Sequence, residues 1–320
     1  PDAKIFWYWK SVKRLSNYLQ RNNINVIVST GPPHTNHLIA MKVSKRFGIP
    51  WVADFRDPWT NIDFYNKLNL TYFADKIHKK LELKVLKSAH AVTTVSESWS
   101  DDFNKILARR PIVINNGFDP SDFANKSSVR LDSRFTITHA GSMNADRNPK
   151  IFWESLSLLL KSDLRLKHHL EVKLIGPIDI SVVNSIKKHK LNDYVTYIDY
   201  LDHDSVIDHL IASQLLLLPL NNTPNVCGII PGKTYEYIAA RRPILCIGDV
   251  KGDTAKILFE TKAGTVVGFD DNKLMNKEVL RYYNLFRNND LTVDSINYNK
   301  YSRKVLAGKF AEVFDGLYTT

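Results

Sequence analysis

The chain has 320 residues, of which 44% are hydrophobic and 24% charged, and these ordinary globular values exclude disordered and fibrous classes. Its length is sufficient for two α/β domains, each burying its own core. Basic residues outnumber acidic ones along the whole chain, and the net charge of +11 attracts phosphates on nucleotides, nucleic acid or anionic lipid. The longest apolar runs are far shorter than the roughly 20 residues of a membrane span.

The first third of the chain alternates strand-like and helix-like segments. In chain order, the expected strands are residues 25–29, 49–53, 91–95 and 111–114. A helix-periodic stretch at residues 38–47 and a long helix ending near Ser88 separate them. This β-α-β-α rhythm is typical of a parallel sheet covered on both faces. Because Trp7, Tyr8 and Trp9 come before any expected strand, we expect a further N-terminal segment before Pro1.

The alternation stops between about residues 117 and 133, where Asn116-Gly117 and Asp119-Pro120 are turn-forming pairs. It resumes with strands expected at residues 135–138, 171–175, 195–198, 215–218, 243–247 and 265–267. We therefore predict an α/β fold of two Rossmann-like domains, whose parallel sheets face an interdomain cleft. The predicted domains are residues 1–125 and 126–301, and a C-terminal helix within residues 302–320 is expected to join the first one. Ligands of open α/β sheets bind at the carboxyl ends of the strands.

One loop at such an edge begins at His139 and includes Gly141, Ser142 and Arg147. A glycine directly after a strand lets the backbone approach a ligand, and an arginine a few residues later is suited to gripping a diphosphate. A plain surface loop with a solvated arginine is the alternative interpretation.

A second loop contains Pro231-Gly232-Lys233-Thr234, followed by Glu236. A helix is expected to start near Lys233 or Thr234, and the free N–H groups at a helix N-terminus together with a lysine favour phosphate binding. Glu236 is placed to accept hydrogen bonds from ribose hydroxyls. The alternative is a simple helix start with a capping glutamate.

This second loop and four other segments resemble the GT-B glycosyltransferases of the GT4 group. The other segments are Trp51-Val-Ala-Asp-Phe-Arg-Asp-Pro-Trp59, Thr94-Val-Ser-Glu97, Asn116-Gly-Phe-Asp119 and His139-Ala-Gly-Ser142. The resemblance covers nearly the whole chain. It implies retaining transfer of a sugar from a nucleoside-diphosphate sugar of UDP or GDP type to a glycan or lipid-linked acceptor. Surface polysaccharide or lipopolysaccharide biosynthesis is the implied pathway, in the cytoplasm or at the inner face of the cell membrane.

The resemblance also assigns roles at the donor site. It implies that Arg147, Lys233 and Glu236 are catalytic, with no protein nucleophile and no cofactor. The implied donor-binding residues are Gly141, Ser142, Gly232 and Thr234. The family's usual motif has two glutamates separated by seven residues. Glu236 matches the second, but Gly228 stands at the first. A non-catalytic nucleotide-binding relative and a nucleotide-sugar epimerase of the same fold therefore remain alternatives.

Acceptor-side candidates follow two strands of the first domain. His34 and His37 lie in a Gly-Pro-Pro loop, where they are candidates for acceptor contact or proton handling, although a solvated loop histidine is the commoner case. Asp54, Arg56 and Asp57 stand at a strand end and are suited to positioning acceptor hydroxyls. An internal ion-pair lock is the alternative for this carboxylate–arginine group.

Two further patterns have an ordinary explanation. Asp202-His203-Asp204 matches a metal-binding DxD pattern, but Asp202 or Asp204 is better explained as a helix N-cap, and we expect no metal requirement. The helix before Ser88 carries Lys76, Lys79, Lys80, Lys84 and Lys87. This basic face is either simply solvated or contacts anionic lipid.

The remaining composition gives two smaller indications. Cys227 and Cys246 lack metal-ligand spacing and favour free thiols in a reducing compartment. No nucleic-acid-binding motif accompanies the basic charge, so we do not expect nucleic acid as a partner.

Overall fold

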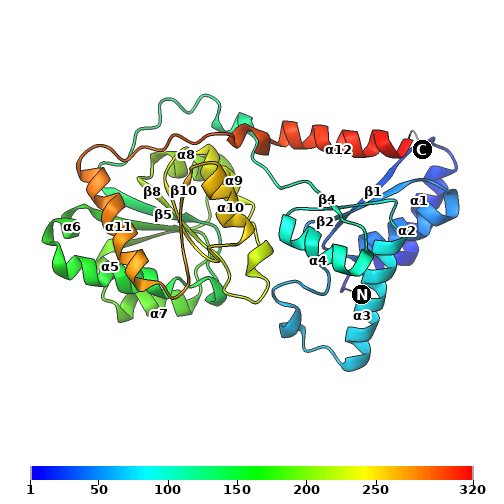
Figure 1. The fold of residues 1–320 in the computed structure, drawn as a ribbon, viewed down its shortest axis with the longest axis horizontal. Coiled ribbons are helices and arrows are strands. Elements are labelled where there is room, and N and C mark those ends of the chain that lie inside the picture. The colour runs from blue at the N-terminus through cyan, green and yellow to red at the C-terminus, as the bar shows by residue number, and fades with distance from the viewer. Residues whose placement is uncertain (1, 319–320) are drawn as a thin grey trace. The chain divides into compact units, whose positions relative to one another are not determined.

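The computed structural model describes residues 2–318, which divide into two compact units (Figure 1). Within the described residues, unit 1 comprises residues 2–116 and 304–318, and unit 2 comprises residues 117–303. The chain thus changes units at 116/117 and 303/304, whereas the boundaries predicted from the sequence were 125/126 and 301/302. The earlier crossing has a physical reason, because Phe118 is buried in a hydrophobic cluster of unit 2.

The two ends of unit 2 are joined to each other. Phe118 and Ser302 form a parallel β-bridge. The Phe118 N–H donates to the Tyr301 carbonyl at 3.1 Å, and the Arg303 N–H donates to the Phe118 carbonyl at 2.8 Å. The chain therefore enters and leaves unit 2 at adjacent positions.

The sheet of unit 1 is parallel and has the strand order β1-β2-β3-β4. Its strands are β1 Ile27–Gly31, β2 Trp51–Phe55, β3 Ala91–Thr94 and β4 Ile112–Val113. All four were predicted, with ends that differ by at most two residues. Every residue of β2 is buried, because it lies between two neighbouring strands and is covered on both faces.

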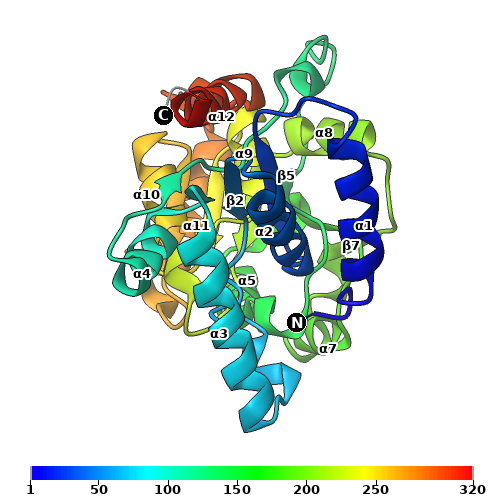
Figure 2. The same cartoon turned by 90° about the vertical axis from the view of Figure 1, so that its right-hand side faces the viewer.

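The helices of unit 1 are α1 Trp7–Leu19, α2 Thr35–Phe47, α3 Tyr72–Ser88, α4 Glu97–Leu107 and α12 Arg303–Tyr318, of which α12 belongs to this unit from Lys304 onward. The starts of α3 and α4 are fixed by side-chain caps, since the Thr71 and Ser96 hydroxyls accept from N–H groups of the first turn. Val12 of α1 packs against Ile39 and Val43 of α2. Helix α3 extends away from the sheet, with its N-terminal end farthest out (Figures 1 and 2).

The sheet of unit 2 is also parallel and has the order β10-β9-β8-β5-β6-β7. Its strands are β5 Phe135–Ala140, β6 Leu170–Ile175, β7 Val195–Ile198, β8 Leu215–Pro219, β9 Ile244–Ile247 and β10 Gly264–Val267. The order reverses between β5 and β8. At such a reversal the loops after the two strands diverge, and ligands of doubly wound sheets bind there.

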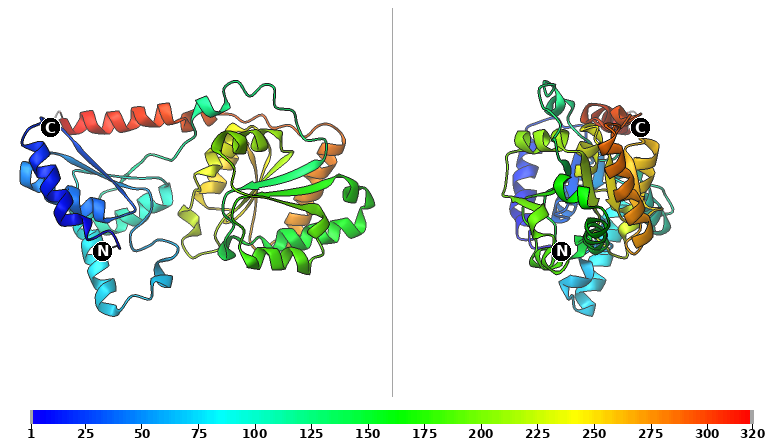
Figure 3. Two further views of the ribbon diagram at one scale, coloured as in Figure 1. Left: turned by 180° about the vertical axis from the view of Figure 1, so that it is seen from behind. Right: turned by 90° about the vertical axis from the view of Figure 1, so that its left-hand side faces the viewer.

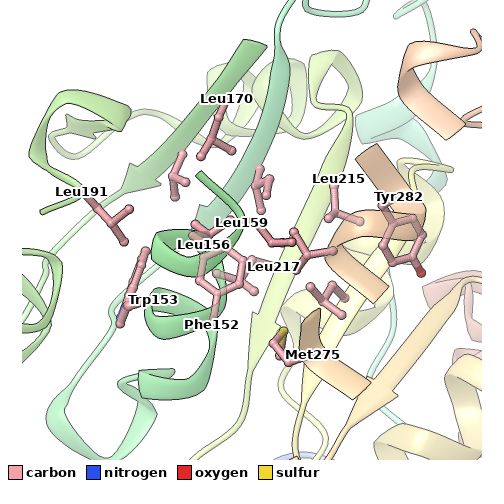
Figure 4. Close-up of a cluster of buried hydrophobic side chains, with 14 of the residues drawn as sticks. Phe152, Trp153, Leu156, Leu159, Leu170, Leu191, Leu215, Leu217, Met275 and Tyr282 are labelled. Carbon is pink, nitrogen blue, oxygen red and sulfur yellow. The ribbon is translucent and has the colours of Figure 1, made fainter. Parts of the chain in front are cut away.

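Helices lie on both faces of this sheet (Figure 3). They are α5 Lys150–Ser162, α6 Leu164–His169, α7 Ile180–Lys188, α8 His203–Ala212, α9 Lys233–Ala239, α10 Asp253–Glu260 and α11 Asn272–Arg287. Alternation along β8 shows how both faces are buried. Leu215 and Leu217 join the cluster with residues of α5 and α11 (Figure 4), whereas Leu216 and Leu218 join residues of α8, α9 and α10. No helix within residues 2–318 combines the length and apolarity needed to cross a membrane.

Candidate active site

The candidate site of unit 2 begins where β5 ends. Gly141 follows Ala140 directly and has a φ of +101°, which a residue with a side chain rarely adopts. A Cβ atom at this position would also lie only 2.7 Å from Lys233 Nζ. Both the backbone conformation and the close approach of the lysine therefore require glycine here.

Lys233 is the first residue of α9, and its side chain crosses the start of the Gly141 loop. Its Nζ donates to the Ala140 carbonyl at 2.5 Å and lies 3.4 Å from His139 Nε2. Among the described residues it forms no salt bridge. Burial, followed by the nearby charge of Arg147, lowers the pKa of Lys233 to about 7 despite the opposing effect of Glu236. The charged form of Lys233 is therefore held only weakly, and an incoming anion would stabilise it.

Arg147 reaches the same loop from its other side. It ends the short helix η3 Ala145–Arg147, whose start is capped by the Asn144 side chain. Its Nη1 donates to the Ser142 carbonyl at 3.0 Å. The structure therefore brings Arg147 and Lys233 together along residues 140–142. That the two residues bind a diphosphate stays a prediction.

Two residues that support this loop were not assigned a role from the sequence. His139 is fully buried, and its Nδ1–H donates to the Leu217 carbonyl at 3.0 Å. Its burial, reinforced by Lys233, holds its pKa well below the usual value, so the ring is neutral. The Tyr237 hydroxyl accepts from the Ala140 N–H at 2.8 Å. Lys233 and Tyr237 stand one helical turn apart, so they share a face of α9, and this spacing could have indicated that both contact the same loop.

Glu236 lies in the first turn of α9, where it is half-buried. Burial raises the pKa of its carboxyl group, while the charges of His203 and Arg303 act in the opposite direction. Its side chain makes no hydrogen bond within the described part of the chain, so its acceptor oxygens are available. His203 is itself held by Asp122, with Nε2 and Oδ2 2.9 Å apart. The positive groups beside Glu236 favour its charged, accepting form.

The start of α9 is tighter than a phosphate-binding helix N-terminus. The Thr234 N–H donates to the Pro231 carbonyl at 2.9 Å, and the Tyr235 N–H donates to the Gly232 carbonyl at 3.2 Å. Two N–H groups that were expected from the sequence to be free are therefore already engaged. The Thr234 hydroxyl is buried and has no hydrogen-bond partner in residues 2–318. Gly232 and Ser142 are both exposed.

A pocket of about 330 Å³ adjoins Arg147 on the same edge of the sheet. Its lining comes from η3, the start of α5, the ends of β8 and β9 and the loops after β8 and β10, and it includes Arg147, Asn148, Asn222, Phe269 and Asp270. A volume of this size is within the range of small-molecule sites.

The DxD-like segment is a helix cap. Both carboxylate oxygens of Asp202 accept from Ser205, one from its N–H and one from its hydroxyl. Asp202 is thus the N-cap of α8, as predicted, and Asp204 pairs with Lys126 at 3.3 Å. Within residues 2–318, no three His, Cys, Asp or Glu side chains gather as metal ligands do.

In unit 1, His34 and His37 are buried among aromatic rings rather than solvated. His34 stacks on Trp59 with ring centroids 4.9 Å apart, and His37 stacks on Phe55 at 4.5 Å. Ser29 Oγ shares a hydrogen bond with His37 Nδ1 at 2.8 Å. Burial lowers the pKa of His34 to about 4 and that of His37 to about 3, so both are neutral near pH 7. His37 has no exposed surface, and a direct acceptor contact would require movement.

The Asp54, Arg56 and Asp57 group does not form the internal ion-pair lock considered as an alternative. Asp54 is buried and accepts from the hydroxyls of Thr30 at 2.8 Å and Thr93 at 2.7 Å. Arg56 is exposed, and its Nη2 donates to the Pro32 carbonyl at 3.0 Å. Burial raises the pKa of Asp57, with Arg56 opposing it. Within the described residues none of the three forms a salt bridge.

The loop after β2 also contains an anchor that was not predicted from the sequence. Glu82 of α3 accepts from the Trp59 N–H at 3.1 Å, the Thr60 N–H at 3.2 Å and the Thr60 hydroxyl at 2.5 Å. A glutamate on a lysine-rich helix is usually solvated. Only the position of Glu82 on the same face as the apolar Val85 and Leu86 could have indicated this role.

Known structures share this architecture over nearly the whole chain. The sucrose-phosphate synthase of Thermosynechococcus elongatus superposes with a TM-score of 0.74 at 12% identity, over 99% of this chain and 79% of that one. HepE of Anabaena, in complex with UDP, superposes with a TM-score of 0.68 at 12% identity, over 95% of this chain and 82% of that one. The trehalose-phosphate synthase of Burkholderia xenovorans superposes with a TM-score of 0.70 at 11% identity, over 97% of this chain and 77% of that one. The fold is therefore that of a GT-B glycosyltransferase, as predicted.

The sequence comparison points to a particular family. Residues 1–122 match the sequence model of Glycosyltransferase Family 4, which confirms the resemblance to the GT4 group. A search of curated protein sequences found no match.

Proposed function

We propose that the chain is a glycosyltransferase that transfers a sugar from a UDP-linked donor, with retention of the anomeric configuration. The observation that carries the proposal is the convergence of Lys233 and Arg147 on residues 140–142, where each donates to a backbone carbonyl oxygen. Two such cations suit a diphosphate, because it carries more than one negative charge and accepts several hydrogen bonds. UDP as the donor nucleotide is supported by structures of HepE with UDP and with UDP-glucose.

The chemical step breaks the bond between the anomeric carbon and the β-phosphate oxygen. The bonding electrons pass to that oxygen, and the diphosphate gains negative charge, which Lys233 and Arg147 stabilise. The acceptor hydroxyl forms a new bond to the anomeric carbon on the same face, and its proton passes to the departing phosphate. No protein nucleophile is needed. Glu236 has unengaged acceptor oxygens for the ribose hydroxyls, which makes it a binding residue in this proposal.

The acceptor is proposed to be a glycan or a lipid-linked sugar of surface polysaccharide biosynthesis, used on the cytoplasmic side of the cell membrane. TarM of S. aureus, whose structure is similar to this chain, was solved in complex with Fondaparinux, α-GlcNAc-glycerol and UDP, which supports this acceptor class. Asp57 and Arg56, at the end of β2, are the proposed acceptor contacts, since both retain surface.

One difference from the GT4 motif favours a second candidate function, that of a non-catalytic nucleotide-binding relative. Gly228, which stands where the GT4 motif has its first glutamate, is buried in the short helix η5 Val226–Gly228. Such a relative would bind UDP without turning over a UDP-sugar. An epimerase, in contrast, would convert a UDP-sugar with no acceptor present.

The test is thermal unfolding with UDP, GDP and ADP, followed by UDP release from UDP-sugars with and without glycan acceptors. A nucleotide at about 100 times its dissociation constant adds roughly 2.7 kcal/mol of stability. We expect a shift with UDP that Lys233→Ala abolishes and the control Lys251→Ala, on an exposed turn, preserves. No shift with any nucleotide would refute the proposal. A shift without UDP release would favour the non-catalytic relative.

A further inference from the structure

The solvent face of α3 carries large apolar side chains among its lysines. Tyr72 is 73% exposed, Phe73 76% and Ile77 50%. At about 100° per residue, these three and Lys76, Lys80 and Lys84 fall within about 140° of arc on one face. The basic face seen in the sequence is therefore a mixed aromatic and basic surface, which we call the α3 face.

No acidic side chain of α3 interrupts the α3 face. Asp75 lies outside it, on the same side of the helix as Glu82, and accepts from Lys79 Nζ at 2.8 Å and from the Tyr65 hydroxyl at 3.1 Å. Glu82 lies on the opposite, buried side and holds the loop after β2. The charged side chains of the α3 face are thus all positive.

The segment before α3 extends the same composition. Phe64 precedes the short helix η1 Tyr65–Leu68, and Leu68 ends it. Both are exposed, as is Lys67. This segment and the first turn of α3 project from unit 1 (Figures 1 and 2). Behind them, α3 is fixed to unit 1 by Val85 and Leu86, which are fully buried. A rigid helix therefore presents the apolar residues at a protruding end.

We propose that the α3 face docks on an anionic lipid bilayer. Exposed aromatic residues suit the boundary between headgroups and acyl chains, and lysines extend their ammonium groups to anionic headgroups above it. A protein partner fits this face less well, because protein interfaces are depleted in lysine. The docking goes beyond the proposed transfer reaction and does not depend on it.

The test is co-flotation of the full chain with phosphatidylcholine vesicles, with and without phosphatidylglycerol. We expect retention only by the anionic vesicles, and release at high salt. Lys76→Gln/Lys80→Gln should weaken partitioning about thirtyfold, since each basic residue near such a surface contributes about fivefold. Phe73→Ser should weaken it about tenfold through lost apolar burial.

Matched controls lie in unit 2. Lys187→Gln/Lys188→Gln removes two charges at the end of α7, and Phe259→Ser removes an exposed aromatic side chain of α10. Both should leave partitioning unchanged. Equal loss in the controls, or equal retention by neutral vesicles, would overturn the proposal. Concentration-dependent self-association that Phe73→Ser abolishes, with no vesicle retention, would overturn it in favour of a protein interface.

Discussion

The two units use the polar residues at the ends of their strands in different ways. In unit 1, Asp54 and Glu82 each accept hydrogen bonds from groups of the same unit, and His37 is enclosed by aromatic rings. In unit 2, Lys233 and Arg147 donate to backbone carbonyls of one loop. The two cations also repel each other, since the charge of Arg147 helps to lower the pKa of Lys233, so a bound anion would improve the environment of both.

The partners of a polar side chain therefore distinguish a structural role from a ligand-binding role better than its position at a strand end does. Asp54, at the end of β2, and Arg147, in the loop after β5, both lie at the sheet edge where ligands of α/β folds bind. In unit 1, however, removing a polar group should cost stability. In unit 2, removing a cation should cost ligand affinity and turnover and leave the fold intact.

The largest effect is expected at the cations of unit 2. Arg147→Ala should lower kcat about a hundredfold to a thousandfold, the loss typical of one electrostatic contact to a developing negative charge. Steady-state release of UDP from the UDP-sugar that the unaltered protein turns over measures it. An unchanged kcat would place Arg147 outside the reaction.

The next effect is expected at the anchor of unit 1. Glu82→Ala should lower the free energy of unfolding by about 3 kcal/mol, because it leaves two N–H groups of the loop after β2 without an acceptor. Denaturant unfolding measures it, with Glu312→Ala on the exposed side of α12 as the control. A loss no larger than that of the control variant would mean that the anchor is unimportant.

One substitution made in both units sharpens the comparison directly. A Cβ on Gly31 would lie 2.6 Å from His37 Nε2, so Gly31→Ala should destabilise unit 1 by about 1–3 kcal/mol. Gly141→Ala should displace Lys233 and weaken UDP binding. The unfolding midpoint and the UDP dissociation constant, measured on both variants, give the result. Equal effects on binding would erase the distinction between the units.

The pH dependence of UDP binding gives a smaller effect. Because the pKa of Lys233 is lowered to about 7 in the free protein, its charged form is lost as pH rises through 7. UDP affinity should therefore fall about tenfold between pH 6 and pH 8 if the bound lysine stays charged. Titration calorimetry measures it, and Lys233→Arg should flatten the profile. A flat profile in the unaltered protein would contradict it.

The smallest effect is expected from metal removal. We propose that turnover needs no metal, and that UDP-sugar turnover in EDTA stays within about twofold of turnover with Mg²⁺, because fixed cations supply the charge that a metal would otherwise bring. Restoration of a lost activity by Mg²⁺ alone would refute this.

Much of the fold could be predicted from the sequence because its strands are continuous apolar runs separated by turn residues. Residues 215–218 and 243–247 are examples, since a strand buried on both faces is apolar along its whole length. Strand ends were less predictable, as in β5, which was predicted to end at Thr138 but continues through His139 to Ala140. Tertiary burial by α9 makes that extension possible, and no local pattern encodes it.

Charged residues in loops could be proposed as site candidates from the sequence. Which side chains are buried could not, because burial depends on contacts between distant parts of the chain. Lys233 and Arg147 could be named as candidates because each follows a glycine in the segment after a strand, although the sequence left a simple helix start and a solvated arginine as alternatives. The burial of His34 depends on Trp59, 25 positions away, which stacks on it from another loop. Spacing within one helix turn contains no information about such a distant contact.

The β-bridge between Phe118 and Ser302 has a consequence for the evolution of this protein. A stretch of chain whose entry and exit lie side by side is a cassette, which can be replaced without reopening the sheet of its host. Residues 117–303 carry the whole proposed donor site between those two ends. Recombination at these two positions would exchange the sugar donor in a single event and leave the acceptor side untouched.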